Sequence, residues 1–404
     1  MVHGGVTLAH LTGGQVALVR GGLPGERVKA DLTNRSGVLQ GVVDEVIDAS
    51  PERVPPSPHP GLDYSHASYA HQLTLKRSVV EDALGRACKE AVSVAPVMAA
   101  PAPWGYRSAV QPAVARTTAE TALGYRQPDS STLVPLTCDP TANAGIGRVW
   151  TLFQRLGVPK GVREIALRGN DAGEVLVCLI ASASAKNYLD FAHTLVREGV
   201  AGVSYASYDP RGRFRSGSER VAGVRSLSQR YGPFDLTVTA TSFAQPNPAA
   251  ATRLYTELTR WAGAGETALD LYAGSGVIGL HLAQTFTQVT ALELDRSSVV
   301  RGGRDAERLG VRNLTFLHAD ARKTALPDAE LIAVDPPRAG LAKATRQAVT
   351  DSSAQKLMYV SCDVATWARD VSELSGAGWT LARVQPFDFY PQTHHIELLS
   401  LLTR

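Results

Sequence analysis

Hydrophobic and polar positions change their spacing several times along the chain, and each spacing predicts a different kind of element. Over residues 1–50, short alternating runs such as "QVALV" and "RVKADLT" are separated by the glycine-rich turns "RGGLPGE" and "NRSG". Short strands with such turns are typical of a small β-barrel, which we predict at residues 1–52. The proline-rich stretch "ASPERVPPSPHPG" then indicates a linker over residues 53–74, because proline cannot donate a hydrogen bond to a sheet.

The pattern becomes mixed after the linker. In "HQLTLKRSVVEDALGRA", Leu73, Val80 and Leu84 fall on one side of a predicted helix, with charged residues on the other side. The strand-like run "EVLVCLIASA" and the helix-like run "NYLDFAHTLVREG" follow it. We therefore predict a central α/β domain at residues 75–240.

Residues 241–404 show a regular alternation. The strand-like runs "TALDLYA", "QVTALELD", "ELIAVD" and "KLMYVSC" are separated by segments long enough to form helices. This alternation predicts a parallel sheet covered on both faces, in a Rossmann-like domain. The predicted fold class is therefore α/β, with a small β-barrel, a central α/β domain and a C-terminal Rossmann-like domain.

Composition adds broad limits. The chain has 404 residues, of which 44% are hydrophobic, which is enough for several hydrophobic cores. No run approaches the ~18 apolar residues of a membrane span, and the first residues lack the features of a signal peptide. We therefore expect a cytoplasmic protein with no membrane partner. The cysteines lie far apart and form no C-x-x-C pair, so no metal site is predicted.

Positive charge is concentrated in one segment, although the net charge is only +3. The stretch "YDPRGRFRSGSERVAGVRSLSQRYG" holds six arginines against Asp209 and Glu219. A polyanion partner would suit this segment, and a solvated loop would explain the same composition.

A glycine-rich turn lies between the first predicted strand and helix of the C-terminal domain. In "ALDLYAGSGVIGL", Gly274, Gly276 and Gly279 let the backbone approach a ligand, and the following helix offers free N–H groups. Glu293 ends the next predicted strand, where a carboxylate can bind both ribose hydroxyls of a nucleoside. A nicotinamide dinucleotide and S-adenosylmethionine both fit this arrangement.

Asp335 favours one of these two cofactors. In "AVDPPRAG" it follows a predicted strand and precedes two prolines, beside the place where a transferable methyl group would project. The prolines stiffen a loop suited to holding a flat substrate. We therefore favour S-adenosylmethionine, although an aspartate here can also cap a turn.

Cys362 ends the predicted strand "KLMYVSC" at the same edge of the sheet. A lone cysteine is usually a small buried hydrophobe, but ligands of such sheets bind at the carboxyl ends of strands. We expect free N–H groups and Arg338 or Arg369 to lower the pKa of its thiol. A thiolate beside a methyl donor suits methylation of uracil, because its addition to carbon 6 makes carbon 5 nucleophilic enough to take the methyl group.

That reaction needs a base to remove the proton from carbon 5. Glu397, in "FYPQTHHIELLSLL", precedes the last predicted strand and is our candidate, and the alternative is a solvent-facing carboxylate on an edge strand. A base inside a stacked helix is unreachable, so the target base must be flipped out or unpaired. The basic segment and the β-barrel would then hold RNA.

Together these motifs resemble the S-adenosylmethionine-dependent RNA (uracil-5-)-methyltransferases that act on ribosomal and transfer RNA. "GGLPGERV" and "SPERVPP" resemble their amino-terminal TRAM barrel, and "SFAQPNPAA", "DLYAGSG", "DPPRAG", "SCDVAT" and "THHIE" resemble their cofactor, substrate and catalytic motifs. The resemblance implies Cys362 as nucleophile and Glu397 as proton acceptor. The implied cofactor contacts are Gln245, Tyr272, Gly274, Gly276, Glu293, Asp320 and Asp335.

Two features depart from the family pattern. Many relatives hold an iron–sulfur cluster on a C-x5-C-x2-C run, where this chain reads "PPSPHPGLDYSHASYAHQ", so no iron–sulfur cluster is expected. The usual S-C-N-P motif reads S-C-D-V here, and Asp363 would disfavour a thiolate if its charge lies close to Cys362.

The resemblance thus implies methyl transfer from S-adenosylmethionine to carbon 5 of a specific uridine by a monomeric enzyme. We expect 23S ribosomal RNA as the substrate, with transfer RNA as the alternative. Two interpretations from other classes stay open. The altered nucleophile motif allows a catalytically silent RNA-binding protein, and the glycine turn allows a nicotinamide-dependent oxidoreductase, which would leave Cys362 and Glu397 unexplained.

Overall fold

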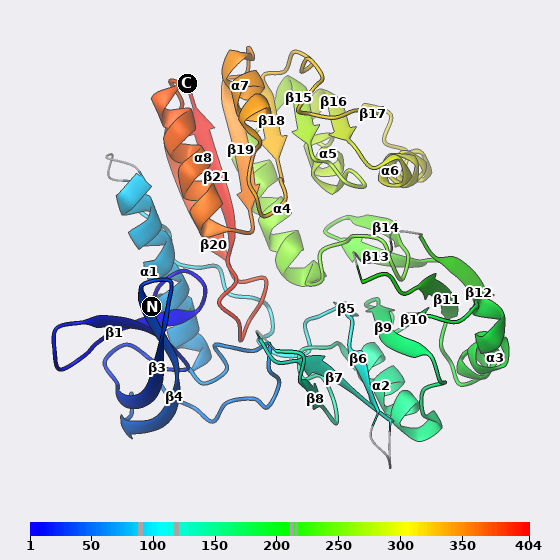
Figure 1. Ribbon diagram of the computed structural model, residues 1–404. Coiled ribbons are helices and arrows are strands. Elements are labelled where there is room, and N and C mark those ends of the chain that lie inside the picture. Colours follow the sequence, from blue (N-terminus) through cyan, green and yellow to red (C-terminus); the bar gives the residue numbers. More distant parts are fainter. Residues whose placement is uncertain (88–91, 117–120, 129, 211–213, 215–216) are drawn as a thin grey trace. The chain divides into compact units, whose positions relative to one another are not determined.

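The candidate site residues follow the strands of one C-terminal sheet. The computed structural model describes residues 1–404 except 88–91, 117–120, 129, 211–213 and 215–216. The C-terminal sheet has the strand order β17-β16-β15-β18-β19-β21-β20 (Figure 1). Its strands are β15 (Gly265–Leu271), β16 (Phe286–Glu293), β17 (Leu314–His318), β18 (Leu331–Val334), β19 (Lys356–Ser361), β20 (Thr380–Phe387) and β21 (Glu397–Thr403).

Strand direction brings the ends of these strands to one edge. β15, β16, β17, β18 and β19 pair in parallel, and the connections between most of them contain a helix. β21 runs antiparallel to both β19 and β20. Its first residue, Glu397, therefore lies at the edge where the parallel strands end.

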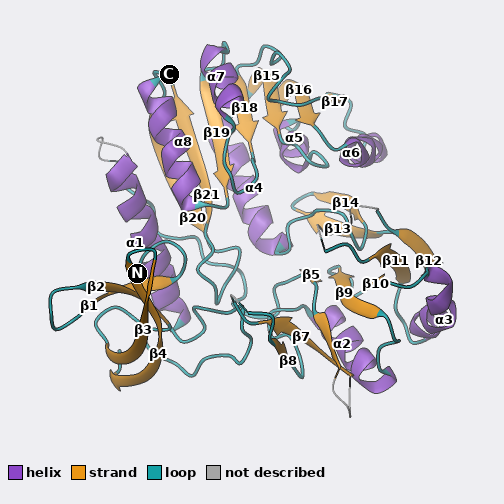
Figure 2. Cartoon of the chain, in the orientation of Figure 1, coloured by secondary structure: helices purple, strands orange, loops and turns teal. Residues whose placement is uncertain are grey.

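Helices cover this sheet (Figure 2). They are α1 (Tyr69–Ala87), α4 (Pro248–Ala262), α5 (Val277–Leu282), α6 (Arg296–Arg308), α7 (Lys343–Asp351) and α8 (Val364–Gly376). α1 packs against α8 and β20, which adds an element from early in the chain to the C-terminal sheet.

Helix α1 agrees with the sequence prediction on its apolar side and differs on its polar side. Val80 and Leu84 are buried as predicted. Lys76 is also fully buried. Its Nζ lies 2.6 Å from Oδ1 of Asp388, which is buried as well. The two charges compensate each other, so removing either one would leave an unpaired charge in the interior.

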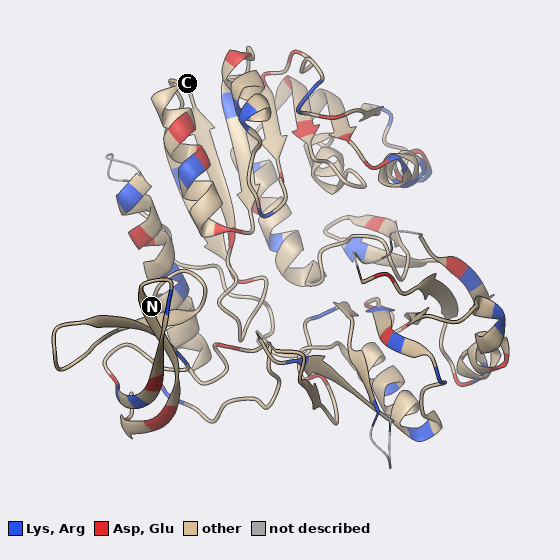
Figure 3. Cartoon of the chain, in the orientation of Figure 1, with Lys and Arg blue, Asp and Glu red and all other residues tan. Residues whose placement is uncertain are grey.

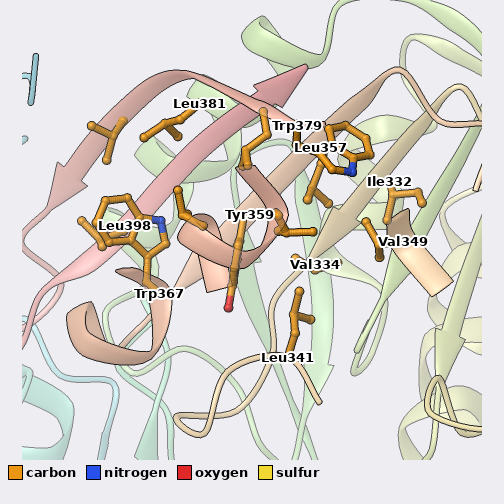
Figure 4. Packing of buried hydrophobic residues seen from close by; sticks show 14 of the residues in the cluster. Ile332, Val334, Leu341, Val349, Leu357, Tyr359, Trp367, Trp379, Leu381 and Leu398 are labelled. Carbon is orange, nitrogen blue, oxygen red and sulfur yellow. The ribbon is translucent and has the colours of Figure 1, made fainter. Parts of the chain in front are cut away.

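The main core of this region lies between the sheet and helices α7 and α8. Trp367 and Leu398 pack together on one side of Tyr359, and Trp379 and Val349 close the other side (Figure 4). The Trp367 indole N–H donates to Ser400 Oγ at 2.9 Å, which satisfies its polar atom inside the core.

An N-terminal sheet has the strand order β1-β2-β4-β3. Its strands are β1 (Val6–His10), β2 (Val16–Arg20), β3 (Arg27–Arg35) and β4 (Val38–Asp48). The segment after β4 is fixed by Arg53, whose guanidinium forms an ion pair of 2.6 Å with Glu26. The predicted linker is therefore bonded to the N-terminal sheet at its start.

The described chain divides into two compact units. The first contains residues 1–57, 62–101 and 252–404, and the second contains residues 58–61 and 102–251. The roles of these parts as RNA-binding and catalytic domains stay predictions.

The second unit is built on a sheet with the order β12-β11-β10-β9-β6-β7-β8, with β5 paired to β9 and a separate hairpin of β13 and β14. Its core lies between this sheet and its helices, around Trp150 and Phe153. Its strands are β5 (Ala109–Val110), β6 (Ala113–Arg116), β7 (Thr121–Arg126), β8 (Leu133–Pro135), β9 (Val162–Gly169), β10 (Val175–Ala181), β11 (Gly202–Ser207), β12 (Glu219–Gly223), β13 (Leu227–Tyr231) and β14 (Phe234–Val238). Its helices are α2 (Ala144–Leu156), the 3-10 helix η1 (Ala185–Tyr188) and α3 (Leu189–Arg197).

The arrangement confirms the predicted α/β fold class, with a strand-rich N-terminal part and a C-terminal parallel sheet. Within the described ranges, no helix combines the length and apolar character needed to cross a membrane.

Candidate active site

One edge of the C-terminal sheet collects most of the residues predicted from the sequence. Tyr272 follows β15, Glu293 ends β16, and Asp335 follows β18. β19 pairs with β21 through Ser361 and Leu398, so the next positions on the two strands are Cys362 and Glu397. Positions opposed in this way in an antiparallel pair have Cα atoms about 5 Å apart. The predicted nucleophile and the predicted base therefore face each other across two strand ends.

The glycine-rich turn after β15 has the backbone geometry that its glycines predict. Gly274 and Gly276 have φ values of 56° and 79°, a region that favours glycine, and Tyr272 adopts a φ of 61°. A Cβ added at Gly274 would meet no atom within 4 Å, so space is open beside the turn. The Tyr272 hydroxyl lies 3.1 Å from Thr345 Oγ1, which fixes its ring.

Two residues that support this turn were not recognised from the sequence. Asp270 is fully buried in β15, and its Oδ2 accepts a hydrogen bond of 2.8 Å from the Gly279 N–H. Phe316 in β17 packs against Gly276 and Gly302, where a Cβ would overlap its ring. The "DLYAGSG" motif contains Asp270, but only the fold shows that its carboxylate accepts the hydrogen bond from Gly279, just after the turn.

Carboxylates near the turn are occupied with local hydrogen bonds. Glu293 accepts from the Gly274 N–H at 2.9 Å and from the Asp295 N–H at 2.6 Å. Asp320 is half-buried and pairs with the Arg322 guanidinium at 2.7 Å, which lowers the pKa of its carboxyl to about 2. Glu293 therefore links the ends of β15 and β16 while standing at the predicted ribose position.

Gln245 belongs to the second unit, in the loop before α4. Its backbone carbonyl accepts a hydrogen bond of 3.0 Å from the Tyr231 hydroxyl, and its side chain is half-buried. The other predicted site residues all belong to the first unit.

The thiol of Cys362 is half-buried, and its pKa is raised to about 12. Burial is the main cause, followed by the negative charges of Glu397, Asp335 and Asp363, while Arg338 acts in the opposite direction. The expectation of a lowered thiol pKa is therefore wrong. Arg369, the other expected partner, instead donates to Asp370 at 2.7 Å.

Two carboxyl groups face the thiol with raised pKa values. Burial raises the pKa of Asp335 to about 7. Burial, with the nearby charge of Asp335, raises the pKa of Glu397 well above its ordinary value, while Arg338 opposes this shift. Glu397 is buried, and its Oε1 has no hydrogen-bond partner among the residues that the structure describes. A buried carboxyl with a raised pKa is able to exchange a proton near neutral pH.

A cavity of about 130 Å³ opens beside Cys362. Its lining residues come from the strand end, the following helix, the loop before β21 and the start of the chain, and they are His3, Arg338, Cys362, Asp363, Val364, His394, His395 and Ile396. His395 is kept neutral there, because burial and the neighbouring His394 and Arg338 lower the pKa of its imidazole to about 3. The sequence indicated Arg338 and His395 as neighbours of the motifs and gave no sign of His3.

Asp363, the unusual residue of the nucleophile motif, caps helix α8. Its Oδ1 accepts from the Thr366 N–H at 2.9 Å, which satisfies a free donor of the first helical turn. The strand end that carries Cys362 is thus followed at once by a capped helix, although the family's proline is replaced by Val364.

The basic segment of the second unit is described only in part. Arg211, Arg213 and Arg215 lie outside the described residues. Arg230 is exposed and forms an ion pair of 3.1 Å with Asp235. Figure 3 shows a further gathering of basic residues on α6. A role of the basic segment in holding RNA stays a prediction.

The described residues contain no group of three or more His, Cys, Asp or Glu side chains placed to hold a metal ion.

Comparison with other proteins decides the family. The chain is 31% identical to an uncharacterized RNA methyltransferase of Thermosynechococcus vestitus, over 96% of this chain and 93% of that protein. Residues 226–404 match the family described as tRNA (Uracil-5-)-methyltransferase. The chain belongs to the RNA methyltransferase family of this relative. This confirms the predicted enzyme class and removes the nicotinamide-dependent oxidoreductase as an alternative.

Further comparisons agree for this RNA methyltransferase. An uncharacterized RNA methyltransferase of Gloeobacter violaceus is 29% identical over 99% of this chain and 94% of that protein. Among solved structures, the tRNA (uracil-54, C5)-methyltransferase of Pyrococcus abyssi, in complex with S-adenosyl-L-homocysteine, matches with a TM-score of 0.77. That structure is 23% identical and the match covers 96% of this chain and 95% of the other, so the two proteins share a fold.

Proposed function

We propose that this RNA methyltransferase transfers a methyl group from S-adenosylmethionine to carbon 5 of a uridine through a covalent bond between Cys362 and carbon 6. The observation that carries the proposal is the facing placement of Cys362 and Glu397 at the paired ends of β19 and β21. A nucleophile and a buried carboxyl at one strand edge are the two groups that this reaction needs.

The protein's part in the reaction has four steps. The Cys362 thiol gives up its proton to water, and the thiolate adds to carbon 6, which shifts the electron pair of the ring double bond onto carbon 5. Carbon 5 takes the methyl group, which bound S-adenosylmethionine supplies from its sulfonium. Glu397 then accepts the proton of carbon 5. The electron pair of that C–H bond restores the ring double bond, and the bond between sulfur and carbon 6 breaks.

The raised pKa of the thiol makes its deprotonation a step that the site has to assist. Arg338 is the cation that favours the thiolate, and it lines the same cavity. Glu397 and Asp335 repel the thiolate when they are ionised, so the charge of this pair controls the reactivity of Cys362. Glu397 has to be ionised when it accepts the proton of carbon 5, so a proton that it holds during the attack must first pass to water.

The glycine turn fits the proposed cofactor. Space is open beside Gly274, where an added Cβ would meet no atom within 4 Å, and Glu293 stands at the end of the adjacent strand. Tyr272, Gly274, Gly276, Glu293, Asp320 and Asp335 would line the cofactor. The resemblance of the motifs also makes Gln245 a candidate cofactor contact.

We propose 23S ribosomal RNA as the first substrate to test, on the resemblance of the motifs. Transfer RNA is the second candidate, because the matched family is described as tRNA (Uracil-5-)-methyltransferase and the Pyrococcus abyssi neighbour acts on transfer RNA. We propose that a monomer carries out the reaction.

The test uses RNA in which 5-fluorouridine replaces uridine. Fluorine at carbon 5 prevents the final proton removal, so the covalent intermediate should be trapped as a protein–RNA adduct that survives denaturation. Wild type is compared with Cys362→Ala, and Cys138→Ala serves as the matched control because its thiol is exposed. Ribosomal and transfer RNA are supplied in separate reactions with S-adenosylmethionine.

We expect an adduct with the wild type and with Cys138→Ala, and none with Cys362→Ala. The RNA that yields the adduct identifies the substrate. Binding of S-adenosylhomocysteine and of RNA without an adduct or a methylated product would instead support a catalytically silent RNA-binding protein and overturn the proposal.

A further inference from the structure

The first residues of the chain reach the candidate active site. His3 lines the cavity beside Cys362, and its Nε2 lies 3.5 Å from Asp363 Oδ2. Asp363 is the residue directly after Cys362, so the imidazole stands next to the charge that departs from the usual nucleophile motif.

The backbone around His3 is held in place. The Val2 N–H donates to the Val6 carbonyl at 2.9 Å, which closes a turn before β1. Gly5 is buried against the catalytic part of the unit, where a Cβ would lie 3.0 Å from His394 Cβ. Met1 packs against the core that includes Val80. The turn that carries His3 is therefore fixed on both sides of the imidazole.

The two oxygens of Asp363 have different tasks. Oδ1 accepts from the Thr366 N–H and caps α8, while Oδ2 faces His3. The capping hydrogen bond holds the carboxylate at the start of the helix, directly after Cys362 in the chain. Its charge is one of those that disfavour the Cys362 thiolate. A cation at His3 is placed to reduce that effect.

We propose that His3 is a positioning residue of the active site, which pairs with Asp363 and thereby limits the repulsion between this carboxylate and the Cys362 thiolate. The proposal rests on the proposed function, because it assumes that the thiolate is the reacting species. The N-terminal turn thus contributes to the chemistry of a site built by the end of the chain.

Other charged and titratable groups face this cavity or the thiol. They are Asp335 after β18, Arg338 in the loop that follows it, His394 and His395 before β21, and Glu397 in β21. His394 is already paired with Asp63 at 2.5 Å. The charges of Glu397 and Asp335 also affect the thiol pKa. Mutation of Asp363 separates the effect of His3 from theirs, because only His3 is proposed to act through Asp363.

The test measures the rate at which iodoacetamide alkylates Cys362, followed by mass spectrometry of the peptide that contains it, between pH 6 and pH 9.5. This readout needs neither RNA nor methyl transfer, so it can fail or succeed independently of the proposed function. The variants are His3→Ala, His3→Gln, Asp363→Asn and the double variant His3→Ala/Asp363→Asn. His10→Ala is the matched control, because His10 is an exposed histidine of β1 that does not line the cavity.

At pH 6.5 we expect alkylation to be about 3–10-fold slower in His3→Ala and in His3→Gln than in wild type, because both lack the imidazolium charge. The difference should shrink as pH rises, since the contact with Asp363 raises the pKa of His3 above its ordinary value and the charge is lost above that pKa. Asp363→Asn should react faster than wild type and still cap α8. In that background, His3→Ala should change the rate less than about 2-fold.

Three results would overturn the proposal. The first is wild-type alkylation rates in His3→Ala at every pH. The second is an effect of His3→Ala that is the same at every pH, which a merely structural role would give. The third is an equal loss with and without the Asp363 carboxylate, which would mean that His3 does not act through Asp363. Slower alkylation in His10→Ala would show that the change is not specific to the cavity and would count against it as well.

Discussion

The carboxylates at the two halves of one sheet edge differ in their hydrogen bonding and in their pKa values. On the glycine-turn side, at the ends of β15 and β16, Glu293 accepts two backbone hydrogen bonds and Asp295 caps α6. On the thiol side, at the ends of β18 and β19 and the start of β21, Asp335 and Glu397 have raised pKa values. Within the described part of the chain, Glu397 Oε1 is buried there without a hydrogen-bond partner.

The difference teaches which groups hold the shape of the site and which are free to react. A carboxylate with several donors stabilises the local backbone and stays ionised. A buried carboxyl without donors reduces the stability of the fold and persists where the surrounding structure holds it, which is typical of functional sites. Asp270 combines the two, because one of its oxygens holds Gly279 while the other is buried without a partner.

The largest effect is expected for Glu397→Gln. Methyl transfer should fall by about 10²–10⁴-fold, because the amide cannot accept the carbon 5 proton. A covalent adduct should then accumulate with ordinary uridine RNA. The thermal midpoint should stay the same or rise, because a buried carboxyl is replaced by a neutral group of the same shape.

Glu293→Gln is the matched control on the glycine-turn side. It should lower the thermal midpoint and the affinity for S-adenosylhomocysteine, since an amide holds two backbone N–H groups less well than a carboxylate. If thermal unfolding shows the same loss of stability in Glu293→Gln and Glu397→Gln, the hydrogen-bonded and the unpaired carboxylate do not differ in their effect on the fold.

Two neighbouring glycines in α6 allow a test of whether the packing of Phe316 against Gly276 and Gly302 stabilises the glycine turn. A Cβ at Gly302 would lie 2.5 Å from the Phe316 ring and 2.6 Å from the Ser275 carbonyl oxygen. Gly302→Ala should therefore lower the free energy of unfolding by about 1–3 kcal/mol and weaken S-adenosylhomocysteine binding in calorimetry.

Gly303→Ala, one residue along the same helix, meets no atom within 4 Å. It should raise the free energy of unfolding by about 0.5–1 kcal/mol and leave binding unchanged, because alanine favours a helix over glycine. If the two alanine variants behave alike, the contact with Phe316 does not support the turn.

The thiol side should also show a pH dependence of stability. The pKa of Asp335 rises from 3.8 to about 7 on folding, so the folded state binds its proton more tightly than the unfolded chain does. This contribution is complete below pH 3.8 and is lost as pH rises to about 7. Asp335→Asn should remove up to about 4 kcal/mol of the decline in the free energy of unfolding over that range, because each pKa unit corresponds to about 1.4 kcal/mol.

Denaturant unfolding at several pH values measures this decline. Because Glu397 contributes in the same direction, the Glu397→Gln variant should flatten the profile as well. A profile that is unchanged in both variants would mean that the two carboxyls titrate with ordinary pKa values.

The smallest effect is expected for the cap of α6. Burial alone would raise the pKa of Asp295, but hydrogen bonds from Ser297 and Ser298 outweigh burial and bring it to about 2. Asp295→Ala should lower the free energy of unfolding by about 1 kcal/mol, and Asp295→Asn by a few tenths, because asparagine also caps helices. Both should keep full methyl transfer, and a larger loss in Asp295→Asn than in Asp295→Ala would contradict the cap.

The sheet edge could be predicted from the sequence because its signals are local. Alternating strands and helices, the glycine turn and the strand-end positions of Glu293, Asp335 and Cys362 are each contained in a short window. The shared edge follows from the parallel arrangement of the strands, so the neighbourhood of Asp335 and Cys362 needed no further information. Their catalytic and binding roles stay predictions.

Long-range contacts could not be predicted in this way. The partners Lys76 and Asp388 are 312 positions apart, and His3 meets a residue near the other end of the chain. The thiol pKa was wrongly predicted because the sequence does not show the burial of Cys362 or the charge of Glu397 beside it, which together raise this pKa. The fold also directs the Arg369 guanidinium to Asp370.

The burial of Lys76 against Asp388 has a consequence for how the protein is made. A ribosome delivers α1 long before β20, β21 and the loop between them, so this helix emerges with a charged side chain that has no interior to enter. Residues 102–251 of the second unit are synthesised in the meantime and have their own core on which to fold. The first unit is complete only when its final strands emerge, so Lys76 can pair with Asp388 only at that stage.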